Sequence, residues 1–107
     1  MEIKIEELEK FANDSKNNIK VKVCIENALK VKKKYGGSIY QGNASYYSFQ
    51  DNKVFYTKGH IWNVINFKSE FNTPEEQIID IYNYKENREF LYFGYVGSQI
   101  PINLITS

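Results

Sequence analysis

A change of pattern at Gly36-Gly37 constrains the fold of this chain more than any other feature. Before these glycines, apolar residues recur at helical spacing; after them, short aromatic and β-branched runs alternate with turn residues. Helices followed by consecutive strands are typical of an α+β domain, in which a helix covers one face of an antiparallel sheet. A chain of 107 residues is long enough to bury one core, so we expect a single domain over 1–107.

Two helices are predicted before the glycines. The first covers residues 5–13, and its apolar face is made by Ile5, Leu8, Phe11 and Ala12. The second covers about 19–35, where an i, i+3, i+4 stripe consists of Val21, Cys24, Ile25, Ala28, Val31 and Tyr35. Lysines in its last turn favour a helix that ends at Gly36. This prediction places Cys24 in the middle of a buried helical face.

Five to seven antiparallel strands are predicted after the glycines. The expected strands lie near 38–41, 45–50, 53–58, 60–68, 89–96 and 100–106. The segment 73–84 is ambiguous, because Thr73-Pro-Glu-Glu76 has the form of a helix capping box. The run IIDIYNY, followed by a four-residue turn and EFLYFGYV, favours a β-hairpin instead. We therefore favour a strand from about residue 78.

Charge and composition argue against several classes of protein. The net charge of +1 leaves no overall electrostatic footprint for nucleic acid or anionic lipid. Apolar stretches are shorter than the roughly 18 residues that span a bilayer, and the N-terminus has no secretory signal. A single cysteine suits a reducing compartment, so we expect a cytoplasmic protein that does not associate with membranes.

No catalytic, metal-binding or cofactor-binding residue is predicted. Cys24 and the sole histidine, His60, are the residue types of a thiol enzyme, but Cys24 is expected inside a helix face and His60 at a solvent-facing turn beside Gly59. One Cys and one His do not make a zinc site. The glycine-rich stretch 35–42 follows a helix instead of preceding one, which is the wrong order for a phosphate-binding loop. The chain is therefore expected to be non-enzymatic.

Aromatic residues make up 16% of the chain, more than a dry core of this size requires. If Ile61, Phe67, Ile79, Leu91 and Phe93 face the helices, strand alternation turns a second set outward. That set, a candidate partner-binding surface, comprises Trp62, Val64, Asp80, Tyr82, Tyr84, Phe90 and Tyr92. Two alternatives remain: cross-strand aromatic pairs stabilise an open sheet face, or the sheet curls and encloses the rings.

The layout of a long helix, Gly-Gly and strands that end in VFYTKGHIWNVINF resembles small cystatin-like or NTF2-like α+β modules. In size and in its lack of predicted catalytic residues, the chain is also similar to bacterial immunity proteins that neutralise polymorphic or contact-dependent toxins. This resemblance implies a protein partner, a toxin, although immunity proteins against nucleases are often more acidic. One alternative is a small-ligand enzyme or binder with a pocket in a curled sheet. Another is a nucleic-acid-binding protein that uses Lys30 to Lys34 and tyrosine stacking.

Overall fold

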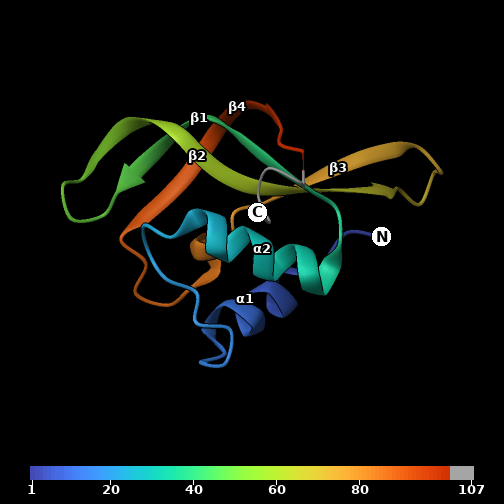
Figure 1. The fold of residues 1–107 in the computed structure, drawn as a ribbon, viewed down its shortest axis with the longest axis horizontal. Helices are drawn as coiled ribbons and strands as arrows, with labels where there is room; N and C mark the ends of the chain where they lie inside the picture. Colours follow the sequence, from blue (N-terminus) through green and yellow to red (C-terminus); the bar gives the residue numbers. More distant parts are fainter. Residues whose placement is uncertain (102–107) are drawn as a thin grey trace.

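Two helices lie on the same side of a four-stranded antiparallel sheet in the computed structural model, which describes residues 1–101 (Figure 1). The elements follow the order α1 (Ile5–Asn13), α2 (Cys24–Tyr35), β1 (Ser38–Ser48), β2 (Lys53–Lys68), β3 (Pro74–Ile79), the 3-10 helix η1 (Ile81–Tyr84) and β4 (Phe90–Gln99). The strand order in the sheet is β3-β2-β1-β4. The predicted α+β class and the bounds of the first helix are confirmed.

The sheet has four strands over the described residues, not five to seven, because predicted pieces merge. Residues 38–41 and 45–50 belong largely to the single strand β1, and 53–58 and 60–68 to the single strand β2. The segment predicted as ambiguous is a strand earlier than expected, at Pro74–Ile79, and then turns into η1. The capping box at Thr73 therefore starts no helix. The strand predicted near 100–106 lies almost entirely outside the described residues.

The second helix begins at Cys24, not near residue 19, which is the most consequential correction to the sequence prediction. The preceding run Ile19-Lys-Val-Lys-Val23 alternates β-branched residues, which lose side-chain freedom in a helix. Lys22 adopts a left-handed backbone conformation with φ of 67°, which no α-helix continues through. The Asn27 side chain donates to Lys20 O at 2.7 Å and accepts from Lys20 N at 3.3 Å. These bonds hold the loop against the first turn of α2.

Two bulges curl the sheet. The register of β1 with β2 shifts between Gly42 and Ala44, opposite Gly59, and its register with β4 shifts between Asn43 and Ser45, near Gly94. Both Gly59 (φ 72°) and Gly94 (φ 63°) have left-handed backbones that suit glycine. Bulged strands bend and twist more strongly, and here η1, which follows the edge strand β3, contacts the other edge strand, β4. Asn83 of η1 exchanges hydrogen bonds with the backbone of Tyr92 in β4, at 3.2 and 3.3 Å.

The bulges also explain why aromatic rings occur at both odd and even positions. Each bulge adds one residue, so the alternation of β2 reverses at Gly59. Phe55 pairs with Tyr46 before the bulge and Trp62 pairs with Tyr40 after it, and Tyr40 and Tyr46 have the same parity in β1. An odd-numbered ring and an even-numbered ring of β2 therefore lie on one face. The predicted alternative in which the sheet curls around its rings describes this arrangement.

The core joins the helices to the sheet in two clusters. Leu8 and Phe11 of α1 pack with Ile19, Val31 and residues that flank Asp80, and a second cluster unites Ala28 of α2 with Ile39 and Ile61. The buried Asn63 side chain donates to Ala28 O at 2.9 Å and so fixes α2 on β2. No helix among residues 1–101 is long and apolar enough to cross a membrane.

Candidate active site

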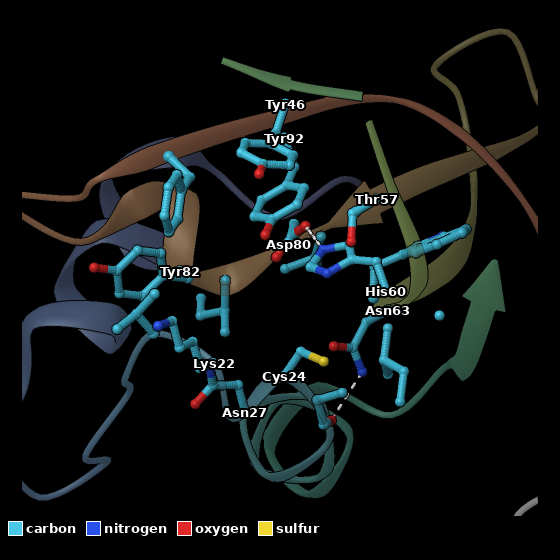
Figure 2. A pocket seen from close by; sticks show the side chains of 18 of the residues that line it. Lys22, Cys24, Asn27, Tyr46, Thr57, His60, Asn63, Asp80, Tyr82 and Tyr92 are labelled. Atoms are coloured by element: carbon cyan, nitrogen blue, oxygen red, sulfur yellow. Dashed lines mark hydrogen bonds and ion pairs between the residues drawn. The ribbon is translucent and has the colours of Figure 1, made fainter. Parts of the chain in front are cut away.

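A cavity of about 280 Å³ lies where the first turn of α2 meets β2 and the end of β3. Its lining includes Cys24, His60 and Asp80, which come from these three elements (Figure 2). Figure 2 shows the His60 ring between the Asp80 carboxylate on one side and the Cys24 thiol on the α2 side. His60 is 36 positions after Cys24 and 20 positions before Asp80 in the sequence. The fold thus places a thiol, an imidazole and a carboxylate in one row.

Cys24 is the first residue of α2 and a partly buried free thiol. The first N–H groups of a helix have no intrahelical acceptor, and the helix dipole places positive potential there, which favours a thiolate. The thiol also packs at the edge of the cluster of Ala28, Ile39 and Ile61. It therefore has a fixed position, at the end of a helix, and faces the cavity.

His60 lies directly after the Gly59 bulge and is buried, with 8% of its surface exposed. The prediction of a solvent-facing histidine at a turn is therefore wrong. Its Nε2 contacts Asp80 Oδ2 in a buried ion pair. The Tyr92 ring stacks on the imidazole with a centroid distance of 3.9 Å and an angle of 7°. Stacking and the carboxylate together fix the plane and rotation of the ring.

Asp80 directly follows β3, whose last residue, Ile79, pairs with Asn63 of β2. The carboxylate is 7% exposed and also accepts a hydrogen bond from the Tyr95 hydroxyl at 3.1 Å. Burial, followed by the charge and the hydrogen bond of Asp80, raises the pKa of Tyr95, so this hydroxyl remains a donor. A buried carboxylate needs such partners. Asp80 therefore orients His60 and balances a positive charge on the imidazole.

The pKa values of the thiol and the imidazole move toward each other. Burial is the largest influence on Cys24 and raises its pKa, but the neighbouring His60, through its polar ring and its charge, and the backbone of Ile61 lower the pKa overall. Burial lowers the pKa of His60, but the contact with Asp80, the carboxylate charge and the neighbouring Cys24 thiol raise it to about 9. Both shifts favour the ionised forms of the two groups, a thiolate and an imidazolium.

The residues predicted as a partner-binding surface lie elsewhere than expected. Trp62, Val64 and Asp80 are buried, with 2%, 5% and 7% of their surface exposed, so their predicted exposure is wrong. Tyr82 and Tyr84 pack against the core around α1, and Phe90 and Tyr92 pack against Tyr46. Five of the seven line the cavity, namely Trp62, Asp80, Tyr82, Phe90 and Tyr92.

The prediction of inward-facing Leu91 and Phe93 is also wrong. Leu91 is 36% exposed and Phe93 is 43% exposed, because β4 turns Phe90 and Tyr92 inward toward Tyr46 and His60. The prediction placed the more aliphatic set of alternate residues in β4 toward the core. In the structure the aromatic set lies inside, because its rings stack on one another on the concave face of the sheet. The exposed rings are thus a different set from the predicted one.

Sequence reasoning identified Cys24 and His60 as the only residue types for a thiol site but separated them by assuming a longer helix. The β-branched alternation of residues 19–23 was the available signal that the helix starts at Cys24. Within residues 1–101 no group of His, Cys, Asp and Glu side chains is arranged to hold a metal ion. Comparisons with protein-family models, with curated proteins and with solved structures gave no match to this chain.

Proposed function

We propose that the protein is a cysteine-dependent enzyme of acyl transfer, which cleaves an amide or ester through a thioester on Cys24. One observation carries this proposal: Cys24, at the start of α2, shares a cavity with a buried His60–Asp80 pair. A nucleophile, a base beside it and a third group that orients the base are the recurring parts of such enzymes, in which the bond between nucleophile and base is often long before substrate binds. The non-enzymatic character predicted from the sequence rested on keeping these residues apart.

Each residue has a distinct role in the proposed reaction. The Cys24 thiolate attacks the carbonyl carbon, and the negative charge that develops on the carbonyl oxygen is stabilised by N–H groups of the first turn of α2. His60 then gives its proton to the departing amine or alcohol, and a thioester remains on Cys24. Water attacks the thioester, its proton passes to His60, and the thiolate leaves. Asp80 keeps the imidazole oriented throughout.

Turnover of p-nitrophenyl acetate tests the nucleophile without knowledge of the natural substrate. We expect wild-type protein to release p-nitrophenolate and to form an acetyl adduct that peptide mapping by mass spectrometry places on Cys24. Cys24→Ser abolishes both signals. His60→Gln lowers the rate by about 10²- to 10⁴-fold, the usual contribution of a general acid or base.

Lys33→Gln is the matched control for these variants, because Lys33 is exposed in the last turn of α2 and does not line the cavity. Its rate should equal that of the wild type. Equal turnover by wild type and Cys24→Ser, with circular dichroism showing both folded, contradicts the proposal.

A protein-binding module is the second candidate, and an exposed apolar sheet face favours it. Tyr47 of β1 lies between Val54 of β2 and Leu91 of β4, and Ser45 lies between Tyr56 and Phe93. Val54 is 61% exposed and Leu91 is 36% exposed. Tyr56 is 59% exposed and Phe93 is 43% exposed. Exposed apolar patches of this kind mark contacts with other molecules. We propose that, if the protein neutralises a toxin, the toxin binds to this exposed face and not to the buried residues around Trp62.

Toxin neutralisation in a bacterial growth assay, with the product of the neighbouring gene as toxin, separates the two candidates. For a binding module, Tyr56→Ser combined with Phe93→Ser abolishes protection, whereas Cys24→Ser keeps it. If the protein is the proposed enzyme and not a binding module, the wild type itself gives no protection. Protection that survives the double variant rules out this face as the toxin contact.

A further inference from the structure

Three lysines line the cavity that contains Cys24, and they come from two elements that face each other across it. Lys20 and Lys22 belong to the loop before α2, and Lys58 belongs to β2 just before the bulge. All three are exposed. The one acidic residue in the described lining, Asp80, is buried and already paired with His60. The rim of the cavity is therefore positively charged without a compensating carboxylate.

The ammonium groups of these three lysines have no hydrogen-bond or ion-pair partner within residues 1–101, and they line the cavity. Lys30, Lys32 and Lys85 each donate through Nζ to a backbone carbonyl, of Asn18, Gly37 and Ile19 respectively. No such bond, and no ion pair, involves the side chains of Lys20, Lys22 or Lys58 in the described part of the chain. Ammonium groups held at a cavity without partners attract anions.

The backbone places two of these lysines firmly. Both polar backbone groups of Lys20 bond to the buried side chain of Asn27. Lys22, two residues before the nucleophile, has the left-handed φ of 67° that non-glycine residues seldom adopt. Such conformations persist where the surrounding structure enforces them and concentrate at functional sites. The loop backbone therefore holds both lysines beside the cavity, where their exposed side chains can meet an entering ligand.

The opposite wall is aromatic and the space is small. Tyr46, Phe90 and Tyr92 form a cluster of rings whose centroids are 5.1 to 6.4 Å apart, and these rings line the same cavity. Its volume of about 280 Å³ is at the lower end of small-molecule sites. The cavity therefore suits a compact group with one apolar side and one charged side.

Building on the proposed function, we propose that the acyl compound attacked by Cys24 is small and anionic. Its carboxylate or phosphate group, a few atoms from the carbonyl, would be held by Lys20, Lys22 and Lys58. The positive rim has a second consequence for the same site, because it offsets the negative charges of the Cys24 thiolate and Asp80, which otherwise repel an anion.

Alkylation of Cys24 by iodoacetate and by iodoacetamide tests this proposal with reagents that differ in charge and little in size. In both reactions the thiolate sulfur bonds to the CH₂ carbon and iodide leaves. The same chain unfolded in urea supplies the intrinsic ratio of the two rates. We expect the ratio of iodoacetate to iodoacetamide rates to be higher in the folded protein and to fall as salt is raised from about 0.05 M to about 0.5 M.

Lys22→Gln should lower this ratio by about two- to fivefold, the range of an exposed charge interaction, and Lys33→Gln should leave it unchanged. Protection of Cys24 from iodoacetamide by glutarate or by inorganic phosphate then shows which anion binds. A folded ratio no higher than the unfolded one, or equal effects of the two variants, overturns the anionic substrate. If iodoacetamide still reacts rapidly and depends on His60, the proposed enzyme function stands; if Cys24 reacts with neither reagent, both proposals fail.

Discussion

The two ends of β2 differ in almost every physical property. Residues 60–64, after the Gly59 bulge, are buried without exception and carry the histidine of the proposed site. Residues 53–56, at the hairpin with β1, are all exposed, although three of them are large and apolar. Figure 1 shows this hairpin extending away from the helices. One strand thus supplies a closed, rigid site at one end and an open surface at the other.

The difference follows from what packs against each end. Residues 60–64 have α2 on one side, through Ala28, and the rings of Tyr92 and Tyr95 on the other. The hairpin residues have neighbouring strands but no helix above them. Catalytic groups require fixed geometry, whereas a contact surface requires exposure. We infer that chemistry belongs to the closed end and any protein contact to the open end.

The largest expected effect on stability is at Trp62. Its ring is 98% buried and packs against Tyr95 with a centroid distance of 4.9 Å. Trp62→Ala should lower the free energy of unfolding by about 3–5 kcal/mol, since it leaves a cavity at the closed end. Urea denaturation followed by circular dichroism measures this. A loss under 1 kcal/mol would mean that the closed end is not the rigid part of the molecule.

A smaller effect should appear in the pH dependence of stability, through His60. Asp80 helps to raise the pKa of His60 to about 9 in the folded protein, against about 6.5 in an unfolded chain. Because the folded state holds this proton more tightly, the contribution is fully present below about pH 6.5 and is lost as the pH rises through about 9. The depressed pKa of Cys24 acts in the opposite direction, so Cys24→Ser is the suitable background.

In Cys24→Ser, the free energy of unfolding should fall on the order of 1–2 kcal/mol from pH 6.5 toward pH 9. Adding Asp80→Asn should flatten this decline, because the imidazolium loses its carboxylate. Denaturation midpoints at a series of pH values provide the test. A decline of the same size in the double variant would show that the ion pair does not hold the His60 proton.

The smallest effect is expected at the open end. Tyr56 is 59% exposed, so Tyr56→Ser should change the free energy of unfolding by no more than about 0.5 kcal/mol. The rate of Cys24 alkylation should also stay at the wild-type value, since Tyr56 does not line the cavity. A slower alkylation in this variant would show that the two ends of β2 are coupled.

The sequence predicted local structure well and long-range placement poorly. Apolar spacing located α1 from Ile5 to Asn13, and the turn between β1 and β2 was also predicted, because both are local effects, whereas the predicted turn at Gly59 lies inside β2. The start of α2 depends on bonds between Asn27 and Lys20 that periodicity does not register. The candidate site could not be predicted for this reason: Cys24 packs against the core, as predicted, but it lies at the start of the helix and lines a cavity with His60.

The contact between His60 and Asp80 depends on strand register, which the sequence left open. Apolar residues occur at both odd and even positions of β2, so the sequence does not show which face of the strand packs against the core. The bulge at Gly59 then reverses the alternation, and the pairing of Asn63 with Ile79 brings Asp80 to the imidazole. A turn beside Gly59 was a reasonable prediction, but a bulge inside one long strand has different consequences for His60.

The pH dependence of Cys24 alkylation by iodoacetamide tests the central claim most directly, because it reports the thiolate itself. In the wild type we expect the rate to rise at a pH well below the ordinary thiol pKa of about 8.5, since His60 and the Ile61 N–H lower the pKa of Cys24. In His60→Gln the rise should return toward the ordinary value. A wild-type profile that follows an ordinary thiol, unchanged by His60→Gln, would contradict the account of Cys24 as an activated nucleophile.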